Sequence, residues 1–212
     1  MMLTRKQKII YEVFNAITHG IGFIASVVLI ILLLIRGVNH SLNSYELSSL
    51  AIYGFTLLSL YLASTLFHCL AFTRARRIFQ IFDHSNIFLL IAGTYTPYCV
   101  IMLGDTKGYA MLIGVWVLAI GGILLHLLTH GKRQKTETTI YILMGWLVMI
   151  AGPDLYHSLS LSGFWLLVSG GVVFTIGAII YSFPNVRGMH LIWHFFVLAG
   201  TTLMYASIYL NI

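Results

Sequence analysis

Long runs of apolar residues make up most of this chain, and short polar stretches carrying most of its charges separate them. A transmembrane helix needs ~20 mostly apolar residues to cross ~30 Å of hydrocarbon. The runs are long enough for that, and they lack the ~10-residue alternating segments of a membrane β-barrel. Because lipid admits only helices or closed barrels, the sequence predicts an all-α integral membrane protein.

The charge content supports a lipid environment. Only 8% of the residues are charged and 59% are hydrophobic, whereas soluble domains have about 25% charged residues. A soluble fold of this length could not bury so much apolar surface, which excludes an ordinary cytosolic enzyme, a disordered chain and a small secreted scaffold. The net charge of +6 falls in short clusters between the apolar runs, which is typical of membrane topology signals, so no nucleic-acid partner is expected.

Seven transmembrane helices are expected, in a single domain over residues 1–212 without a linker or soluble domain. Residues 1–14 are expected to form a cytoplasmic amino-terminal segment. The first apolar run is long and six more follow, so it is interpreted as a span and not as a cleavable signal peptide. The predicted helices are roughly Ala16–Ile35, Leu47–Leu70, Ile78–Leu103, Tyr109–Leu128, Thr139–His157, Phe164–Phe183 and Met189–Ile208.

The basic residues predict the orientation of this seven-helix bundle. Ten lie on one predicted side and two, Arg36 and Lys107, on the other. The positive-inside rule therefore places the amino terminus in the cytoplasm and the carboxy terminus outside. Cys69 and Cys99 then lie near opposite membrane faces and are not expected to form a disulfide. The ten residues are Arg5, Lys6, Lys8, Arg74, Arg76, Arg77, Lys132, Arg133, Lys135 and Arg187.

Ionisable residues within the predicted spans gather near the cytoplasmic side. His68 ends the second helix, Asp83 opens the third, and His190 and His194 open the seventh. At 1.5 Å per residue, each lies roughly 4–11 Å along the helix axis from a basic loop residue. Three helices far apart in sequence therefore place polar groups at a similar depth, and such groups are functional candidates by default.

The spacing of these residues indicates a metal site. His190 and His194 are four residues apart, so their imidazoles share one helix face. With His68 they form a three-histidine set that leaves one position open, which is the arrangement of a catalytic zinc. Ser64 lies one turn deeper than His68. Asp83 is either a base acting through bound water or a direct fourth ligand.

A structural interpretation stands beside the metal site, because a lone intramembrane histidine more often packs or forms hydrogen bonds. His126 and His130 have the same four-residue spacing, but they end the fourth helix beside Lys132, where a solvated or headgroup-facing role suffices. His84 follows Asp83 by about 100° of helix rotation and is expected to face the loop.

At these residues the chain resembles the hemolysin III family, the bacterial branch of the progestin and adipoQ receptor family, which includes the adiponectin receptors. The resemblance covers nearly the whole chain and rests on four motifs in order. They are Glu12-x-x-Asn15-x-x-x-His19, Ser64-x-x-x-His68, Asp83-His84 followed by Gly93-Thr94-Tyr95-Thr96-Pro97, and His190-x-x-x-His194.

The resemblance implies a seven-helix protein of a bacterial cytoplasmic membrane with its amino terminus inside. It implies that His68, His190 and His194 bind Zn²⁺, with Asp83 near the metal and Ser64 beside it. Related alkaline ceramidases cleave a lipid amide with such a constellation, so a membrane lipid is the expected partner.

The remaining motif residues allow two interpretations. Glu12, Asn15 and His19 share one stripe of the first helix, where they either orient the ligands or substrate or form a polar clamp that ties the amino-terminal segment to the bundle. The clamp is the simpler interpretation. Gly93 and Pro97 are expected to serve helix packing and a helix kink.

Three functions remain open at this point. The leading hypothesis is a zinc-dependent hydrolase of a lipid amide or ester near the inner leaflet, with Asp83 moving the proton and Ser64 holding water or an oxyanion. The second is a cytolytic or pore-forming protein, for which the apolar mid-membrane segments offer little support. The third is a regulator or sensor of membrane lipid state that uses zinc as a structural staple.

Overall fold

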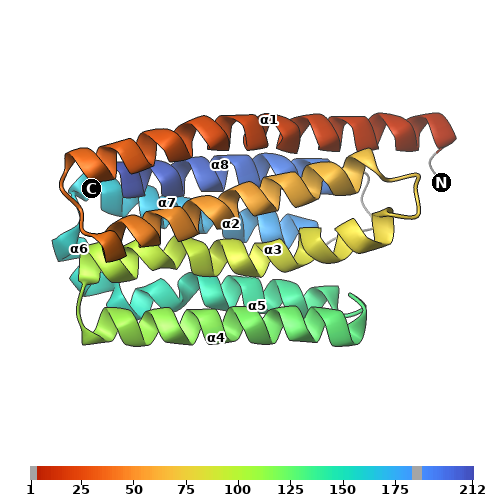
Figure 1. Cartoon of the computed structure of the whole chain (residues 1–212). Coiled ribbons are helices and arrows are strands. Elements are labelled where there is room, and N and C mark those ends of the chain that lie inside the picture. Colours follow the sequence, from red (N-terminus) through yellow and green to blue (C-terminus); the bar gives the residue numbers. More distant parts are fainter. Residues whose placement is uncertain (1–3, 183–187) are drawn as a thin grey trace.

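The computed structural model describes residues 4–182 and 188–212, and within them it is an all-helical bundle with its two termini at opposite ends (Figure 1). This part contains seven helices long and apolar enough to cross a membrane, as predicted. Two residues of the predicted topology lie outside the described residues: Phe183, the expected end of the sixth helix, and Arg187, an expected loop charge. The spans are α1 (Arg5–Asn39), α2 (Ser44–Cys69), α3 (Arg76–Pro97) with the π-helical turn η1 (Tyr98–Leu103), α4 (Thr106–Thr129), α5 (Gln134–Trp146) with the 3₁₀ turn η2 (Leu147–Ala151) and α6 (Gly152–Ser158), α7 (Leu161–Tyr181) and α8 (Met189–Leu210).

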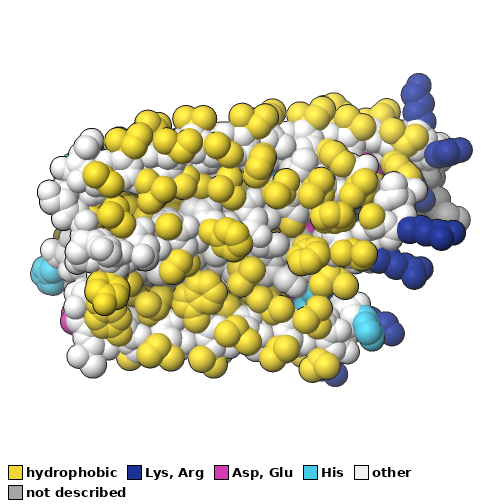
Figure 2. Space-filling model, viewed as in Figure 1, with side chains coloured by type: hydrophobic (Ala, Val, Ile, Leu, Met, Phe, Trp, Pro, Cys, Tyr) yellow, Lys and Arg dark blue, Asp and Glu magenta, His cyan; other side chains and the backbone are white. Residues whose placement is uncertain are grey.

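Apolar side chains cover the flanks of the bundle, and Lys and Arg side chains gather at one end (Figure 2). This basic end is formed by the start of α1 and by the connections α2–α3 and α4–α5. Such a distribution is what a bilayer requires, with hydrocarbon around the flanks and charge at the headgroups. That the basic end is cytoplasmic stays a prediction from the positive-inside rule.

Helix α1 begins at Arg5, about three turns before the expected start at Ala16. A capping box starts it: the Thr4 hydroxyl accepts a hydrogen bond from the Gln7 backbone N–H at 3.3 Å, and the Gln7 side chain accepts one from the Thr4 N–H at 3.0 Å. Most of the expected amino-terminal segment is therefore helical, which brings Glu12 onto the same rigid element as the membrane span.

The fifth predicted helix, Thr139–His157, is interrupted where α5 gives way to η2. Pro153 has no backbone N–H to continue an α-helical ladder. The Tyr95 hydroxyl of α3 lies 2.8 Å from the carbonyl oxygen of Met144 and accepts a hydrogen bond from the Val148 N–H at 2.7 Å. A broken helix is tolerated at this depth because a side chain from a neighbouring helix satisfies the freed backbone groups.

Helix α3 passes through the centre of the bundle, and its close contact with α2 depends on Gly93. A Cβ at Gly93 would clash with the Thr56 side chain of α2, so the predicted packing role of Gly93 is confirmed. The α-helix ends at Pro97 and continues as the wider turn η1. The polar end of α3 is thereby held against α2, which carries His68.

Candidate metal site

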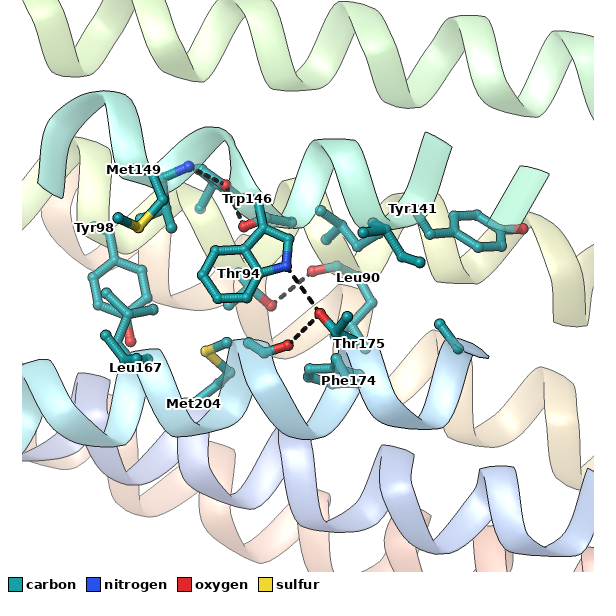
Figure 3. Close-up of a pocket in the computed structure, with 18 of the residues that line it drawn as sticks. Leu90, Thr94, Tyr98, Tyr141, Trp146, Met149, Leu167, Phe174, Thr175 and Met204 are labelled. Atoms are coloured by element: carbon teal, nitrogen blue, oxygen red, sulfur yellow. Dashed lines mark hydrogen bonds between the residues drawn. The ribbon is translucent and has the colours of Figure 1, made fainter. Parts of the chain in front are cut away.

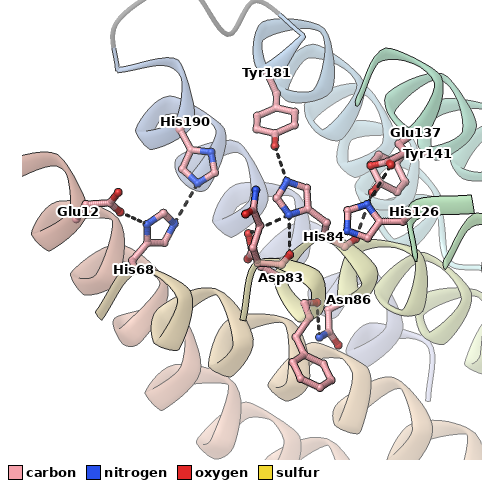
Figure 4. Close-up of polar contacts among 12 residues, drawn as sticks. Glu12, His68, Asp83, His84, Asn86, His126, Glu137, Tyr141, Tyr181 and His190 are labelled. Atoms are coloured by element: carbon pink, nitrogen blue, oxygen red, sulfur yellow. Dashed lines mark hydrogen bonds and ion pairs between the residues drawn. The ribbon is translucent and has the colours of Figure 1, made fainter. Parts of the chain in front are cut away.

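Three imidazoles from two helices converge near the basic end of the bundle. His68 lies near the carboxyl end of α2, and His190 and His194 lie in the first turns of α8. One nitrogen of each ring lies within 4.8 Å of the other two, and the Nε2 atoms of His68 and His190 are 3.0 Å apart (Figure 4). His68 and His194 are buried and His190 is half-buried. This group could hold a metal ion.

Glu12 of α1 fixes the orientation of the His68 ring. Its Oε2 lies 2.6 Å from His68 Nδ1, and its Oε1 accepts a hydrogen bond from Arg76 at 3.3 Å. A carboxylate paired with a guanidinium accepts hydrogen bonds only, so Nδ1 of His68 carries the hydrogen. The Nε2 lone pair therefore points to the centre of the triad, as in carboxylate–histidine–metal arrangements.

The Thr18 hydroxyl fixes the orientation of the His194 ring. Thr18 of α1 donates its hydrogen to the Asn15 carbonyl oxygen at 2.9 Å, and its oxygen lies 3.1 Å from His194 Nδ1. Since the Thr18 hydrogen is already engaged, Nδ1 of His194 donates and its Nε2 keeps the lone pair. Two of the three rings are thus set in the tautomer that binds a metal through Nε2.

A small cavity of about 10 Å³, enough for one water, lies beside the triad. Asp83 and Ser64 both line it. Asp83 is outside the set of ligand atoms that lie within 4.8 Å of one another, so its position fits contact through water better than direct ligation. We call this space the metal cavity; its walls are His19, Leu60, Ser64, Asp83, His84, Ile87, Tyr181, His190, Trp193, His194 and Val197.

Several buried polar atoms around the metal cavity are unpaired within the described residues: Ser64 Oγ, Asn15 Oδ1 and both ring nitrogens of His19. The His19 ring stacks on His194 with centroids 3.6 Å apart. Buried polar atoms are normally satisfied, so this concentration indicates that the site takes up water or a polar ligand.

The predicted stripe of Glu12, Asn15 and His19 therefore faces the triad. Glu12 combines the two interpretations, because it orients His68 and also ties α1 to Arg76 at the start of α3. The Asn15 carbonyl engages Thr18, and His19 packs directly against His194.

The expectations for His84 and His126 were wrong. His84 does not face the loop: its Nε2 lies 3.1 Å from the Tyr181 hydroxyl and its Nδ1 lies 2.8 Å from the Gln80 carbonyl oxygen. His126 is not solvated: it is buried, its Nδ1 lies 3.0 Å from Glu137 Oε1, and its ring stacks on His84 with centroids 5.2 Å apart (Figure 4). We call His84, His126, Glu137 and Tyr181 the His84 cluster.

Glu137 and Tyr181 belong to this cluster without having been predicted. Helix α5 begins at Gln134, before the expected start at Thr139, so Glu137 lies in the first turn of α5 and not in a loop. There it is buried against His126 of α4. A glutamate eleven positions after an intramembrane histidine, across a short helical hairpin, was the available signal. Tyr181 gave none, because aromatic residues commonly end membrane spans.

The fold and the site together define a multi-pass helical membrane protein with a buried histidine triad that could hold a metal ion. Residues 7–205 match the family described as Haemolysin-III related, and the chain belongs to this family.

Curated relatives agree with that assignment. The chain is 42% identical to Hemolysin-3 of Bacillus cereus and 41% identical to the Hemolysin-3 homolog of Bacillus subtilis (strain 168), in each case over 92% of this chain and 88% or 91% of the relative. It is 26% identical to the human monocyte to macrophage differentiation factor, over 92% of this chain and 82% of that protein.

Proposed function

We propose that this protein is a zinc-dependent hydrolase of a lipid amide or ester. It acts in a bacterial cytoplasmic membrane, with its amino terminus and its basic end in the cytoplasm. The observation that carries the proposal is that the small cavity beside the histidine triad shares four wall residues with an apolar cavity between the helices. A lipid bound there would place its polar linkage beside the triad and its chain among apolar side chains.

The donor set fits zinc. Imidazole nitrogens suit zinc, and three protein ligands with an open fourth position are characteristic of catalytic zinc sites. Two nitrogens bound to one zinc at ~2 Å lie at most about 4 Å apart, and the Nε2 atoms of His68 and His190 meet that limit at 3.0 Å. The unpaired Ser64 hydroxyl supports a bound water or ligand oxygen nearby.

The apolar cavity has a volume of about 120 Å³ and lies between α3, α5, α7 and α8 (Figure 3). It shares walls with the metal cavity at Leu60, Ile87, Trp193 and Val197. From Ile87 it reaches Tyr98, roughly 16 Å further along α3. Its length and apolar walls suit an acyl chain whose carbonyl lies at the triad.

The chemistry divides between the metal and two side chains. Zinc, when bound, lowers the pKa of its water towards ~7 and polarises a carbonyl. Asp83 accepts the proton of the attacking water and returns it to the leaving nitrogen or oxygen. Ser64 holds the water or the developing oxyanion by a hydrogen bond. Glu12 and Thr18 engage the Nδ1 atoms of His68 and His194, which fixes both rings with Nε2 towards the centre of the triad.

The test is an assay of purified, zinc-loaded protein with ceramide-like amides and with ester lipids, comparing wild type with Asp83→Ala. We expect Asp83→Ala to lower kcat by about 10²–10⁴ while zinc stays bound, which is the range for loss of a general acid–base. Asp154→Ala is the matched control, because Asp154 pairs with Lys107 at the other end of the bundle. The proposal fails if wild type turns over no faster than Asp83→Ala with zinc present in both.

A structural role for zinc is the second candidate, favoured by the way the triad joins helices. One metal would tie α2 to α8, and Glu12 and Thr18 already tie both to α1. A regulator or sensor of lipid state would bind lipid without turnover and lose mainly thermal stability in His190→Ala. The name of the Bacillus cereus relative suggests cytolysis. A cytolytic protein would release dye trapped in liposomes, and the leakage would persist after zinc is removed.

A further inference from the structure

Tyr181 is a wall of the metal cavity to which the proposed hydrolysis gives no part. It ends α7, and its ring centroid lies 5.7 Å from that of His190 and 5.4 Å from that of Trp193. Its hydroxyl points to His84, which lines the same cavity beside Asp83 (Figure 4). A phenol thus lines the space where a ligand oxygen would lie.

The hydrogen bonds of His84 determine which atom of this pair donates. A backbone carbonyl only accepts, so the contact of 2.8 Å with the Gln80 oxygen fixes the hydrogen on His84 Nδ1. The Asp83 carboxylate also lies 3.9 Å from this Nδ1. In the neutral ring with its hydrogen on Nδ1, Nε2 carries the lone pair, and Tyr181 is the donor across the 3.1 Å contact. A hydroxyl hydrogen rotates, and an anionic oxygen accepts a stronger hydrogen bond than a neutral imidazole does. A ligand carboxylate or oxyanion would therefore draw the Tyr181 hydrogen towards itself.

The remainder of the His84 cluster keeps this pair in place. The His126 ring stacks on His84 with an angle of 9° between planes, and Glu137 holds His126 at 3.0 Å. The Tyr141 hydroxyl donates to the main-chain oxygen of His84 at 3.2 Å. Four helices thus fix the positions of His84 and Tyr181, so only the hydroxyl hydrogen has to turn when the ligand arrives.

We propose that the Tyr181 hydroxyl is a hydrogen-bond donor to the carbonyl or carboxylate oxygen of a lipid whose chain lies in the apolar cavity and whose oxygen enters the metal cavity. The inference rests on the proposed function for the class of ligand, a lipid with a carbonyl group. During hydrolysis the water oxygen bonds to the carbonyl carbon, and the π electrons move onto the carbonyl oxygen, which Tyr181 stabilises. Tyr181 transfers no proton. Asp83 carries the water's proton to the leaving nitrogen or oxygen as its bond to carbon breaks.

The test measures binding separately from turnover. Zinc-loaded full-length wild type and Tyr181→Phe are titrated with palmitate, whose carboxylate mimics the oxyanion, and with hexadecanol, which has the same chain without the carboxylate. We expect Tyr181→Phe to bind palmitate about 10-fold more weakly, as for loss of a hydrogen bond to a charged group. Hexadecanol affinity and zinc content should stay at the wild-type level, which shows that the variant is folded. On a lipid that wild type cleaves, kcat should fall by about 10²–10³.

Tyr205→Phe is the matched control. This buried phenol donates to the Leu29 carbonyl at 2.9 Å and lines neither cavity. Its removal should leave the palmitate-to-hexadecanol preference unchanged. Equal palmitate affinity in wild type and Tyr181→Phe, with equal zinc content, overturns the inference.

The two proposals fail in different ways. If wild type cleaves no lipid but palmitate binding still depends on Tyr181, the proposal of a hydrolase fails and the proposed donor role of Tyr181 stands. If zinc-loaded wild type does not distinguish palmitate from hexadecanol, the donor role is lost, and the turnover assay alone decides the proposed function.

Discussion

Two histidine pairs with the same four-residue spacing lie near the basic end, and they have different surroundings. His190 and His194 both belong to α8, and His68 completes their group. His126 lies in α4, but α4 ends at Thr129, and His130 leaves it in a left-handed conformation with φ 49° and an exposed side chain. Spacing places two imidazoles on one helix face only where the helix continues through both.

The partners of the ring nitrogens differ as well. In the triad, Nδ1 of His68 and of His194 is engaged by Glu12 and Thr18, which turns their Nε2 atoms inward. In the His84 cluster, Glu137 engages Nδ1 of His126 as Glu12 engages His68. The ring stacked on His126, however, is that of His84, which uses one nitrogen on a carbonyl oxygen and the other on a phenol. The comparison teaches that a metal site needs converging free lone pairs, whereas buried histidines without them form a hydrogen-bond network.

The largest expected effect is on zinc affinity, which should depend on His194 but not on His126. His194→Ala should weaken zinc affinity by more than about 100-fold, beyond the loss typical of a group that only orients a ligand. His126→Ala should leave zinc affinity unchanged. Competition with a chromophoric chelator measures both. A similar loss of zinc affinity in the two variants would show that the two histidine pairs do not differ in metal binding.

Thermal stability should also distinguish the triad from His126. A ligand that binds only the folded state at 100 times its Kd adds about 2.7 kcal/mol of stability. Wild type and His126→Ala should therefore lose several degrees of Tm when a chelator removes zinc, and His194→Ala should show no such response. Thermal unfolding in one detergent, with and without chelator, is the measurement. A chelator response in His194→Ala would contradict the assignment.

A substitution at Glu12 tests whether its carboxylate orients the triad. Glu12→Gln keeps the size of the side chain but weakens the contact with His68, so zinc affinity should fall by about 10–100-fold. Glu46→Gln is the matched control, because Glu46 caps the start of α2 at the other end of the bundle. If the Glu12 variant binds zinc as tightly as the control, Glu12 is a clamp between helices and no more.

The smallest effect on metal binding is expected at Glu137. Glu137→Leu leaves the buried Nδ1–H of His126 without its acceptor, which should cost about 1–3 kcal/mol of stability. Zinc affinity should stay within about 3-fold of wild type. Equilibrium unfolding and chelator competition on the same sample measure the two. A large loss of zinc affinity would show that the two groups act as one site.

Much of the fold could be predicted from the sequence, because the length and spacing of apolar runs report directly on the bilayer. The early start of α1 was missed because the Thr4 cap lies among charged residues, beyond the apolar run. The break in α5 was missed because the Tyr95 hydroxyl that satisfies it comes from α3. Local pattern therefore predicts the spans, and tertiary contacts decide their ends and irregularities.

The site divides in the same way. His68, His190 and His194 could be found because depth and helix spacing constrain them separately, and both are legible in the sequence. Glu137 was missed because its contact depends on where α5 begins, although its spacing from His126 was a usable signal. Tyr181 gave no signal, because its contact depends on how α7 packs against α3. Depth and helix spacing therefore mark the ligand residues, whereas the contacts of Glu137 and Tyr181 follow from how separate helices pack.

The central claim is that three imidazoles bind one metal ion. Zinc K-edge X-ray absorption of the purified full-length protein tests it most directly. The account predicts about one zinc per chain, with three imidazole nitrogens at ~2.0–2.1 Å and a remaining light-atom ligand. A protein without stoichiometric zinc, or a zinc with sulfur ligands at ~2.3 Å, would contradict it.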